Sequence, residues 1–93
     1  MKLFKNIDDK FEEIGFRKTI DDEYMVRYER PNKKYGYTQH LDILHKASGR
    51  HIVQSCDADL GDEKMIGNTC VGLTYYEMKL IMKKMKKKKW QSK

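Results

Sequence analysis

The chain has 93 residues, of which 39% are hydrophobic and 37% are charged, so it is long enough for one domain but not for two. Its two cysteines are too few for a disulfide-dense secreted scaffold, and no apolar run approaches the roughly 20 residues of a membrane-spanning helix. We therefore expect a cytoplasmic protein without membrane association. A single domain should cover residues 1–90, followed by a disordered basic end at residues 91–93.

The net charge of +6 belongs to one segment of the chain. Residues 79–93 hold eight lysines and no acid, which leaves residues 1–78 with 12 basic and 14 acidic residues and a net charge of −2. The basic character therefore describes the end of the chain rather than the whole domain.

Residues 3–14 are predicted to form a first helix, because apolar residues recur there at helical spacing. Acidic residues occupy the opposite side, and Gly15 follows where a helix can close in a left-handed conformation. Phe16 is then placed to fold back on the last turn. The apolar positions are Leu3, Phe4, Ile7, Phe11 and Ile14, and the acidic ones are Asp8, Asp9, Glu12 and Glu13.

The middle of the chain changes to the two-residue period of half-buried strands. Strands are expected near residues 24–29, 37–43 and 52–56, with a short edge strand at 16–20. Residues 30–34 should break the first of these, because proline cannot donate to a β-ladder. The connections are too short for parallel crossovers, so the sheet should be an antiparallel meander.

The fold class predicted from these elements is α+β, with an N-terminal helix, a three- to four-stranded antiparallel meander and a C-terminal helix. Both helices should pack on one face of the sheet. The other face should be solvated or bind a partner, and it should carry Arg27, Glu29, His40 and Asp42.

Residues 57–72 are acidic and contain glycine without a clear period, which predicts a long loop with a short strand near 69–71. The last helix has stronger signals. Residues 74–77 form a capping box in which Thr74 and Glu77 satisfy each other's amides, flanked by Leu73 and Met78 as a hydrophobic staple. The helix should end near Lys88 or Lys89.

The last helix is expected to cover the sheet with an apolar stripe, while lysines lie on its far side. Trp90 should turn back against the body of the protein. The stripe consists of Met78, Ile81, Met82 and Met85, and the far side of Lys79, Lys83, Lys86 and Lys87.

The sequence contains partial matches to phosphate-, RNA- and calcium-binding motifs, but each lacks a required residue or spacing. Residues 67–74 resemble a phosphate-binding loop, but Leu73 stands where the lysine is required. Residues 33–40 only weakly echo an RNA-binding aromatic strand, and residues 57–62 do not keep calcium-loop spacing. We expect no catalytic residue, metal or cofactor, and no small-molecule substrate. A thiol or metal site at Cys56 and Cys70, or a Cys–His pair, would require those residues to converge.

The order of these segments resembles small uncharacterised proteins encoded by phages, prophages and mobile elements of low-GC Gram-positive bacteria. The similarity covers most of the chain, except that this chain has the long acidic loop. No activity is established for that family, so the resemblance implies no functional residue. The segments that carry it are residues 11–18, 28–30 and 34–37, and the Lys-rich helix from Leu73 to Trp90.

The function expected from the sequence is that of a non-enzymatic accessory protein that binds an unknown protein partner or a second copy of itself. The alternative is a nucleic-acid-binding protein in which lysines grip phosphates and a tryptophan stacks on a base. The residues proposed for this alternative are Lys83, Lys84, Lys86, Lys87, Lys88, Lys89 and Trp90.

Overall fold

A computed structural model describes residues 5–46, 48–58 and 70–88 of the chain. The fold is α+β, as the sequence predicts. Along the chain, a four-stranded antiparallel meander follows the first helix and precedes the last one. The expected end segment at residues 91–93 lies outside the described residues. The elements in chain order are α1 (Ile7–Glu13), β1 (Arg17–Asp21), β2 (Met25–Asn32), β3 (Tyr37–His45), β4 (His51–Asp57) and α3 (Tyr75–Lys88).

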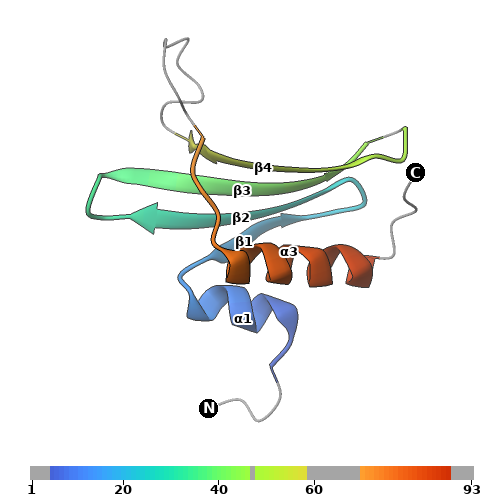
Figure 1. The fold of residues 1–93 in the computed structure, drawn as a ribbon, viewed down its shortest axis with the longest axis horizontal. Helices are drawn as coiled ribbons and strands as arrows, with labels where there is room; N and C mark the ends of the chain where they lie inside the picture. The colour runs from blue at the N-terminus through green and yellow to red at the C-terminus, as the bar shows by residue number, and fades with distance from the viewer. Residues whose placement is uncertain (1–4, 47, 59–69, 89–93) are drawn as a thin grey trace.

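Each strand pairs with its neighbour in the chain, which gives the sheet order β1-β2-β3-β4. Both helices lie on the same side of the sheet and contact each other, and α1 also contacts β1 (Figure 1). The helices therefore cover one sheet face, and the opposite face is left without a helix in the described part of the chain.

The hydrophobic core lies between the helices and the covered face of the sheet. It contains an aromatic cluster in which Phe11 stacks on Tyr28 with ring centroids 4.0 Å apart, and Phe16 meets Phe11 edge-on at 5.9 Å. The buried apolar residues are Ile7, Phe11, Phe16, Val26, Tyr28, Leu41, Ile43, Leu80 and Ile81.

Helix α1 is shorter than the predicted helix over residues 3–14, of which residues 3 and 4 lie outside the described residues. The helix begins after Asn6, which forms a capping box with Asp9: the Asp9 amide donates to the Asn6 side chain at 2.8 Å, and the Asn6 amide donates back at 3.1 Å. This cap fixes the start of α1, and the sequence analysis missed it.

The end of α1 agrees with the prediction. Gly15 has a φ of 97°, the Phe16 amide donates to the Phe11 carbonyl, and the Gly15 amide donates to that of Glu12. These two bonds define a Schellman motif, and the contact between the Phe11 and Phe16 rings is its hydrophobic component.

Strand β2 corrects two expectations. It runs through Pro31 to Asn32 instead of breaking at residue 30, with Pro31 opposite Thr38 of β3. Proline is tolerated there because β1 pairs with β2 only as far as Glu29, so β2 is an edge strand beyond that point. Tyr24, expected in the strand, lies before it and is exposed.

Helix α3 begins where the capping box predicts. The Glu77 amide donates to the Thr74 hydroxyl at 3.1 Å, and the Thr74 amide donates to the Glu77 carboxylate at 2.9 Å. Leu73 packs against the core, and the helix reaches Lys88 as expected. Lys89 and the expected turn at Trp90 lie outside the described residues.

The apolar stripe predicted for α3 is correct for Ile81, which is buried, and for Met85, which packs against the core, but it is wrong for Met78 and Met82. Met78 and Met82 are 44% and 62% exposed, whereas Leu80, Glu77 and Lys84 face the interior beside Ile81. Hydrophobicity alone assigns methionine to the core. The helix is instead rotated about its axis, because Glu77 and Lys84 have charged partners beneath it.

Arg30 of β2 is the first of these partners, and it joins four parts of the fold. Its Nη1 donates to the Ile14 carbonyl at 3.1 Å and to Glu77 Oε2 at 2.8 Å. Its Nη2 donates to Gln39 Oε1 at 2.9 Å, and the guanidinium lies 4.1 Å from the centroid of the Phe16 ring. Arg30 therefore connects the end of α1, the start of α3 and strand β3.

We predict that Arg30→Met lowers the free energy of unfolding by about 3 kcal/mol, because it leaves the buried Glu77 carboxylate without its cation. Glu77→Gln is the matched second change, since glutamine also supports a capping box. Urea denaturation should show that adding Glu77→Gln to Arg30→Met recovers about 1 kcal/mol. A double variant as unstable as the sum of both single changes would contradict this pairing.

Candidate functional site

The lysines proposed from the sequence for nucleic-acid binding divide into two groups. Lys84 is only 8% exposed, and its Nζ lies 3.2 Å from Asp8 and 3.5 Å from Asp21. Lys88 donates to the Asp21 carboxylate at 2.8 Å and to the Asp22 carbonyl at 2.9 Å. These two lysines fasten α3 to α1 and to the end of β1, so we do not assign them to a nucleic-acid site.

Asp8 and Asp21 are the acidic centres of this network, although the sequence placed Asp8 on the solvent side of the first helix. Burial opposes ionisation of Asp8, but hydrogen bonds from Lys18, Tyr28 and Lys84 outweigh it and lower the pKa of its carboxyl. Burial likewise opposes ionisation of Asp21. Hydrogen bonds from Lys18 and Lys88 prevail there and hold its pKa well below the usual range.

The second group of lysines forms an exposed stripe on α3. Lys79, Lys83 and Lys87 follow each other at intervals of four residues, and Lys86 lies beside them. All four are exposed, as the sequence predicts for the far side of this helix. The one acid of α3, Glu77, is buried against Arg30, so it does not neutralise the stripe.

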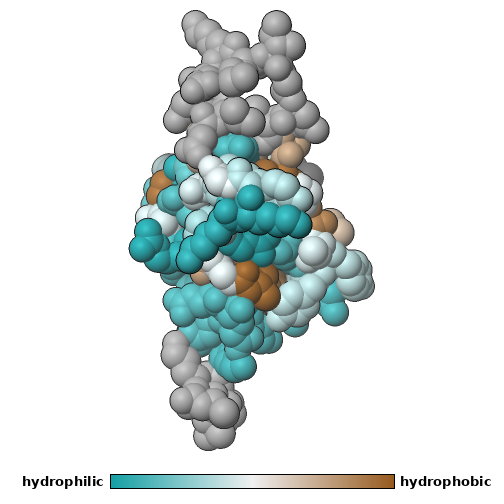
Figure 2. Space-filling model, turned by 90° about the vertical axis from the view of Figure 1, so that its left-hand side faces the viewer, coloured by the Kyte–Doolittle hydropathy of each residue, from teal (hydrophilic) through white to brown (hydrophobic). Residues whose placement is uncertain are grey.

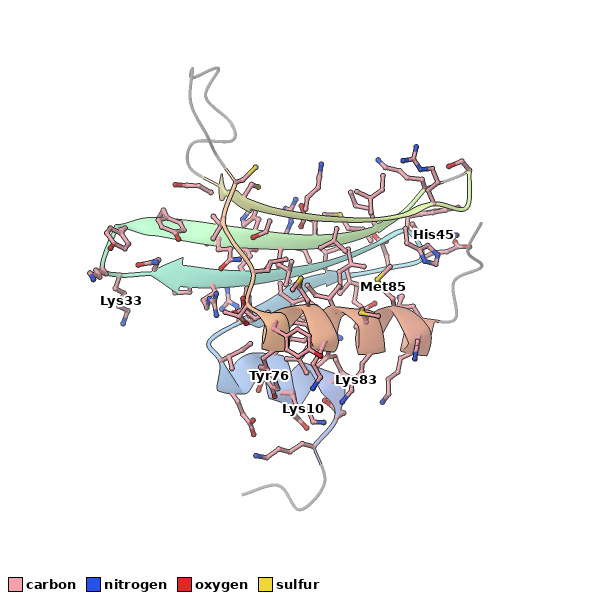
Figure 3. All side chains as sticks on the ribbon, in the orientation of Figure 1. Lys10, Lys33, His45, Tyr76, Lys83 and Met85 are labelled. Atoms are coloured by element: carbon pink, nitrogen blue, oxygen red, sulfur yellow. The ribbon has the colours of Figure 1, made fainter. Side chains whose placement is uncertain are left out.

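Two tyrosines lie at the start of the same surface. Tyr75 is 74% exposed and Tyr76 is 46% exposed, and the Lys79 ammonium lies 5.4 Å from the centroid of the Tyr75 ring. Tyr76 and Lys83 lie on the helical side of the molecule, with Lys10 of α1 below them (Figure 3). We call Tyr75, Tyr76, Lys79, Lys83, Lys86 and Lys87 the lysine–tyrosine stripe. Lys89 and Trp90, the other two residues of the sequence-derived site, lie outside the described residues.

The sheet face opposite the helices is the second candidate surface. Residues that pair across an antiparallel sheet share a face, so the register assigns every strand residue to one side. His40 lies on this face, as the sequence predicts, and His45 lies on the covered one. We call this surface the open sheet face; it carries Arg17, Ile20, Met25, Arg27, Glu29, Pro31, Thr38, His40, Asp42, Leu44, Ile52, Gln54 and Cys56.

The charged residues predicted for the open sheet face are there, but they are paired with one another. Arg27 donates two hydrogen bonds to Asp42, at 2.7 and 3.3 Å, and Asp42 is 6% exposed. The Nε2 of His40 lies 3.3 Å from Glu29. The expectation of a solvated face is therefore wrong for Asp42, because the Arg27 side chain covers it.

One end of the open sheet face is apolar. Met25, Leu44 and Ile52 are cross-strand neighbours on β2, β3 and β4, and each is partly exposed. By contrast, hydrophilic residues cover most of the described surface at the end of the molecule that carries the β2–β3 hairpin (Figure 2). The charged residues of the open sheet face were predicted from the sequence, but this apolar row was not.

The two cysteines converge, although the sequence could not show it. Cys70 lies opposite Cys56 in an isolated antiparallel bridge at the end of β4, so the strand predicted near residues 69–71 is reduced to this one bridge among the described residues. Thr69, the start of the predicted strand, lies outside the described residues. Cys56 is half-buried, but Cys70 is exposed.

The geometry does not support a Cys–His nucleophile or a metal centre among the described residues. Cys56 lies opposite His40 on the open sheet face, but burial and the Asp42 charge raise the pKa of its thiol, which disfavours the reactive thiolate. Residues 5–46, 48–58 and 70–88 contain no group of three or more histidine, cysteine or acidic side chains that could hold a metal ion.

Comparison with family models, curated proteins and solved structures gave no match for this chain. The resemblance to small phage and mobile-element proteins therefore stays a hypothesis. Within the described residues, no helix has the length and apolar character needed to cross a membrane.

We predict that Asp21→Asn lowers the free energy of unfolding by about 1 kcal/mol at neutral pH, because Lys18 and Lys88 lose their shared carboxylate. The pKa of Asp21 is lower in the folded than in the unfolded protein. Its stabilising contribution is therefore complete above the unfolded pKa, near about 4, and is lost as the pH falls through the folded pKa. The difference in stability between wild type and variant should thus shrink progressively as the pH falls below the unfolded pKa toward strongly acidic pH.

Thermal unfolding between neutral and strongly acidic pH measures this convergence. Glu12→Gln, the same kind of charge change at an exposed position of α1, serves as the control and should leave the pH profile unchanged. An Asp21→Asn variant whose deficit stayed constant at every pH would show that the carboxylate charge has no stabilising role.

Proposed function

We propose that the protein is a non-enzymatic interaction module whose protein-binding surface is the open sheet face. The observation that carries this proposal is the row of Met25, Leu44 and Ile52 on a face that neither helix covers. Antiparallel sheets often expose one face, but that face is then usually polar. A partly exposed apolar row beside the Arg27–Asp42 ion pair is the pattern of an interface, in which apolar residues give affinity and polar neighbours give specificity.

The charge distribution favours a second copy of the chain as the partner. Arg17 and Arg27 balance Glu29 and Asp42, so the formal charge of the open sheet face is zero. Two such faces can approach without repulsion, whereas two copies of the lysine–tyrosine stripe would each present four positive charges. Sheets that pack face to face lie about 10 Å apart, a distance at which the two apolar rows would interdigitate. The contact would be isologous, with the same row on both subunits.

Leu44→Glu should weaken self-association by at least about tenfold, because it places a charge at the centre of the apolar row. The matched control is Met82→Glu, which makes a similar change on the exposed side of α3. Sedimentation equilibrium from micromolar to millimolar concentration should show dimers for wild type and the control, and a shift toward monomer for Leu44→Glu. A strictly monomeric wild type, or an equal effect of both variants, would refute the proposed homodimer.

A specific observation also favours a second function, binding of single-stranded nucleic acid by the lysine–tyrosine stripe. Lys79 and Lys87 are about 12 Å apart along the helix axis, so the four exposed lysines can contact successive phosphates of one strand. Tyr75 and Tyr76 present exposed rings on which bases can stack. This proposal keeps Lys83, Lys86 and Lys87 from the sequence-derived set and replaces the paired Lys84 and Lys88 by Lys79.

Fluorescence anisotropy with labelled single-stranded DNA and RNA measures this second function. With about four phosphate contacts, the logarithm of the binding constant should fall against the logarithm of salt concentration with a slope of roughly −3. Changing Lys83, Lys86 and Lys87 together to glutamine should remove most of the slope and of the affinity.

The control for this titration removes the same charge elsewhere, by changing Lys33, Lys34 and Lys46 to glutamine. These lysines lie at the turns on either side of β3, and Lys33 is at the tip of the β2–β3 hairpin (Figure 3). An equal loss of affinity in both triple variants would show that binding depends on the net charge of the protein and not on the lysine–tyrosine stripe. No binding by wild type at micromolar concentration would exclude this function.

A further inference from the structure

Cys56 and Cys70 are brought together by the chain that leads from β4 to α3. β4 ends at Asp57, and the chain returns so that Cys70 lies directly opposite Cys56 in antiparallel orientation. Side chains of directly opposed residues in an antiparallel pair point to the same face. The two thiols are therefore neighbours, although 13 residues separate them in the sequence.

The hydrogen bonding identifies which kind of antiparallel pair they form. The Val71 amide donates to the Ser55 carbonyl at 3.0 Å, one residue beyond Cys70 and one before Cys56. This bond flanks the cysteines rather than joining them, so they occupy a non-hydrogen-bonded position, where Cα atoms are about 4.5 Å apart. A disulfide requires Cα atoms roughly 4.4–6.8 Å apart, so the backbone already has a permitted separation.

The surroundings give the two thiols different roles. Cys70 is exposed, whereas Cys56 is half-buried. Burial raises the pKa of the Cys56 thiol, the negative charge of Asp42 raises it further, and Arg27 opposes them. A reagent from solution therefore meets Cys70 first, and Cys56 is placed to attack the sulfur of Cys70 in a second step.

We propose that Cys56 and Cys70 form a thiol–disulfide exchange site that reacts with low-molecular-weight disulfides such as glutathione disulfide. In the first step the Cys70 thiolate attacks one sulfur of glutathione disulfide, which forms a mixed disulfide and releases one glutathione thiolate. In the second step the Cys56 thiolate attacks Cys70 Sγ, forms the Cys56–Cys70 disulfide and releases the second glutathione. Two protein thiols are oxidised and one disulfide is reduced to two thiols.

The product would fasten the start of the segment leading into α3 to the end of β4. With both thiols free, the contacts between these parts include the backbone β-bridge of Cys56 with Cys70 and the hydrogen bond from the Val71 amide to the Ser55 carbonyl. Because Cys56 belongs to the open sheet face, oxidation would also change one corner of that surface. The exchange chemistry does not depend on either proposed function, since it needs only the two cysteines.

The test equilibrates the full chain in glutathione buffers of increasing oxidised fraction, blocks remaining thiols with an alkylating agent and measures intact mass. The expected result is a species that has lost two hydrogens and carries no glutathione, with Cys56 and Cys70 joined in the peptide map, and that returns to the dithiol in reducing buffer. Accumulation of glutathionylated protein or of disulfide-linked dimers in its place would overturn the proposal.

Two single variants test the order of the steps. Cys56→Ser retains the entry thiol and should accumulate the mixed disulfide at Cys70, which wild type should not. Cys70→Ser should react with glutathione disulfide at least about tenfold more slowly than Cys56→Ser, because it retains only the half-buried thiol of raised pKa. Equal rates in the two variants would refute the assignment of Cys70 as the entry thiol.

Discussion

Arg30 joins the end of α1, the start of α3 and strand β3 through a single guanidinium. Its guanidinium donates to the Glu77 carboxylate, which also accepts from the Thr74 amide in the capping box of α3. A buried carboxylate with one cation is costly to displace, so this contact fixes how the helix is rotated about its axis. That rotation brings Leu80 and Lys84 to the interior and leaves Met82 in solvent.

The rotation of α3 also determines which of its side chains form the exposed lysine–tyrosine stripe. Once Glu77 and Lys84 are interior and Lys88 is paired with Asp21, the other four lysines of α3 are on the outside, and the helix has no exposed acid to balance them. The two helices together cover one face of the sheet, and the opposite face is left to its own ion pairs and to the apolar row around Leu44.

Local signals in the sequence were sufficient for the order of elements, the meander, the glycine end of α1 and the Thr74 cap, because each depends on residues close together in the chain. These local signals failed where a residue far away in the sequence determines whether a side chain is buried or a strand continues. The sequence pattern assigns Lys84 to the surface, because it does not show that Asp8 lies beneath it. It also predicts a strand break at Pro31, because it does not show that the pairing of β1 with β2 ends before this residue. The approach of Cys70 to Cys56 likewise depends on the path between them, for which the sequence has no periodic pattern.

The neighbour-to-neighbour pairing of the strands has a consequence for how the chain folds. Every ladder closes a short loop, so each hairpin can form at a small entropic cost and the sheet can grow from one strand to the next. The contact between Arg30 and Glu77 spans 47 residues, and because closing so long a loop costs more chain entropy than closing a hairpin, we expect this contact to form after the strands have paired. Docking of α3 is thus the step that completes the domain, and the rate at which α3 detaches should set the kinetic lifetime of the native state.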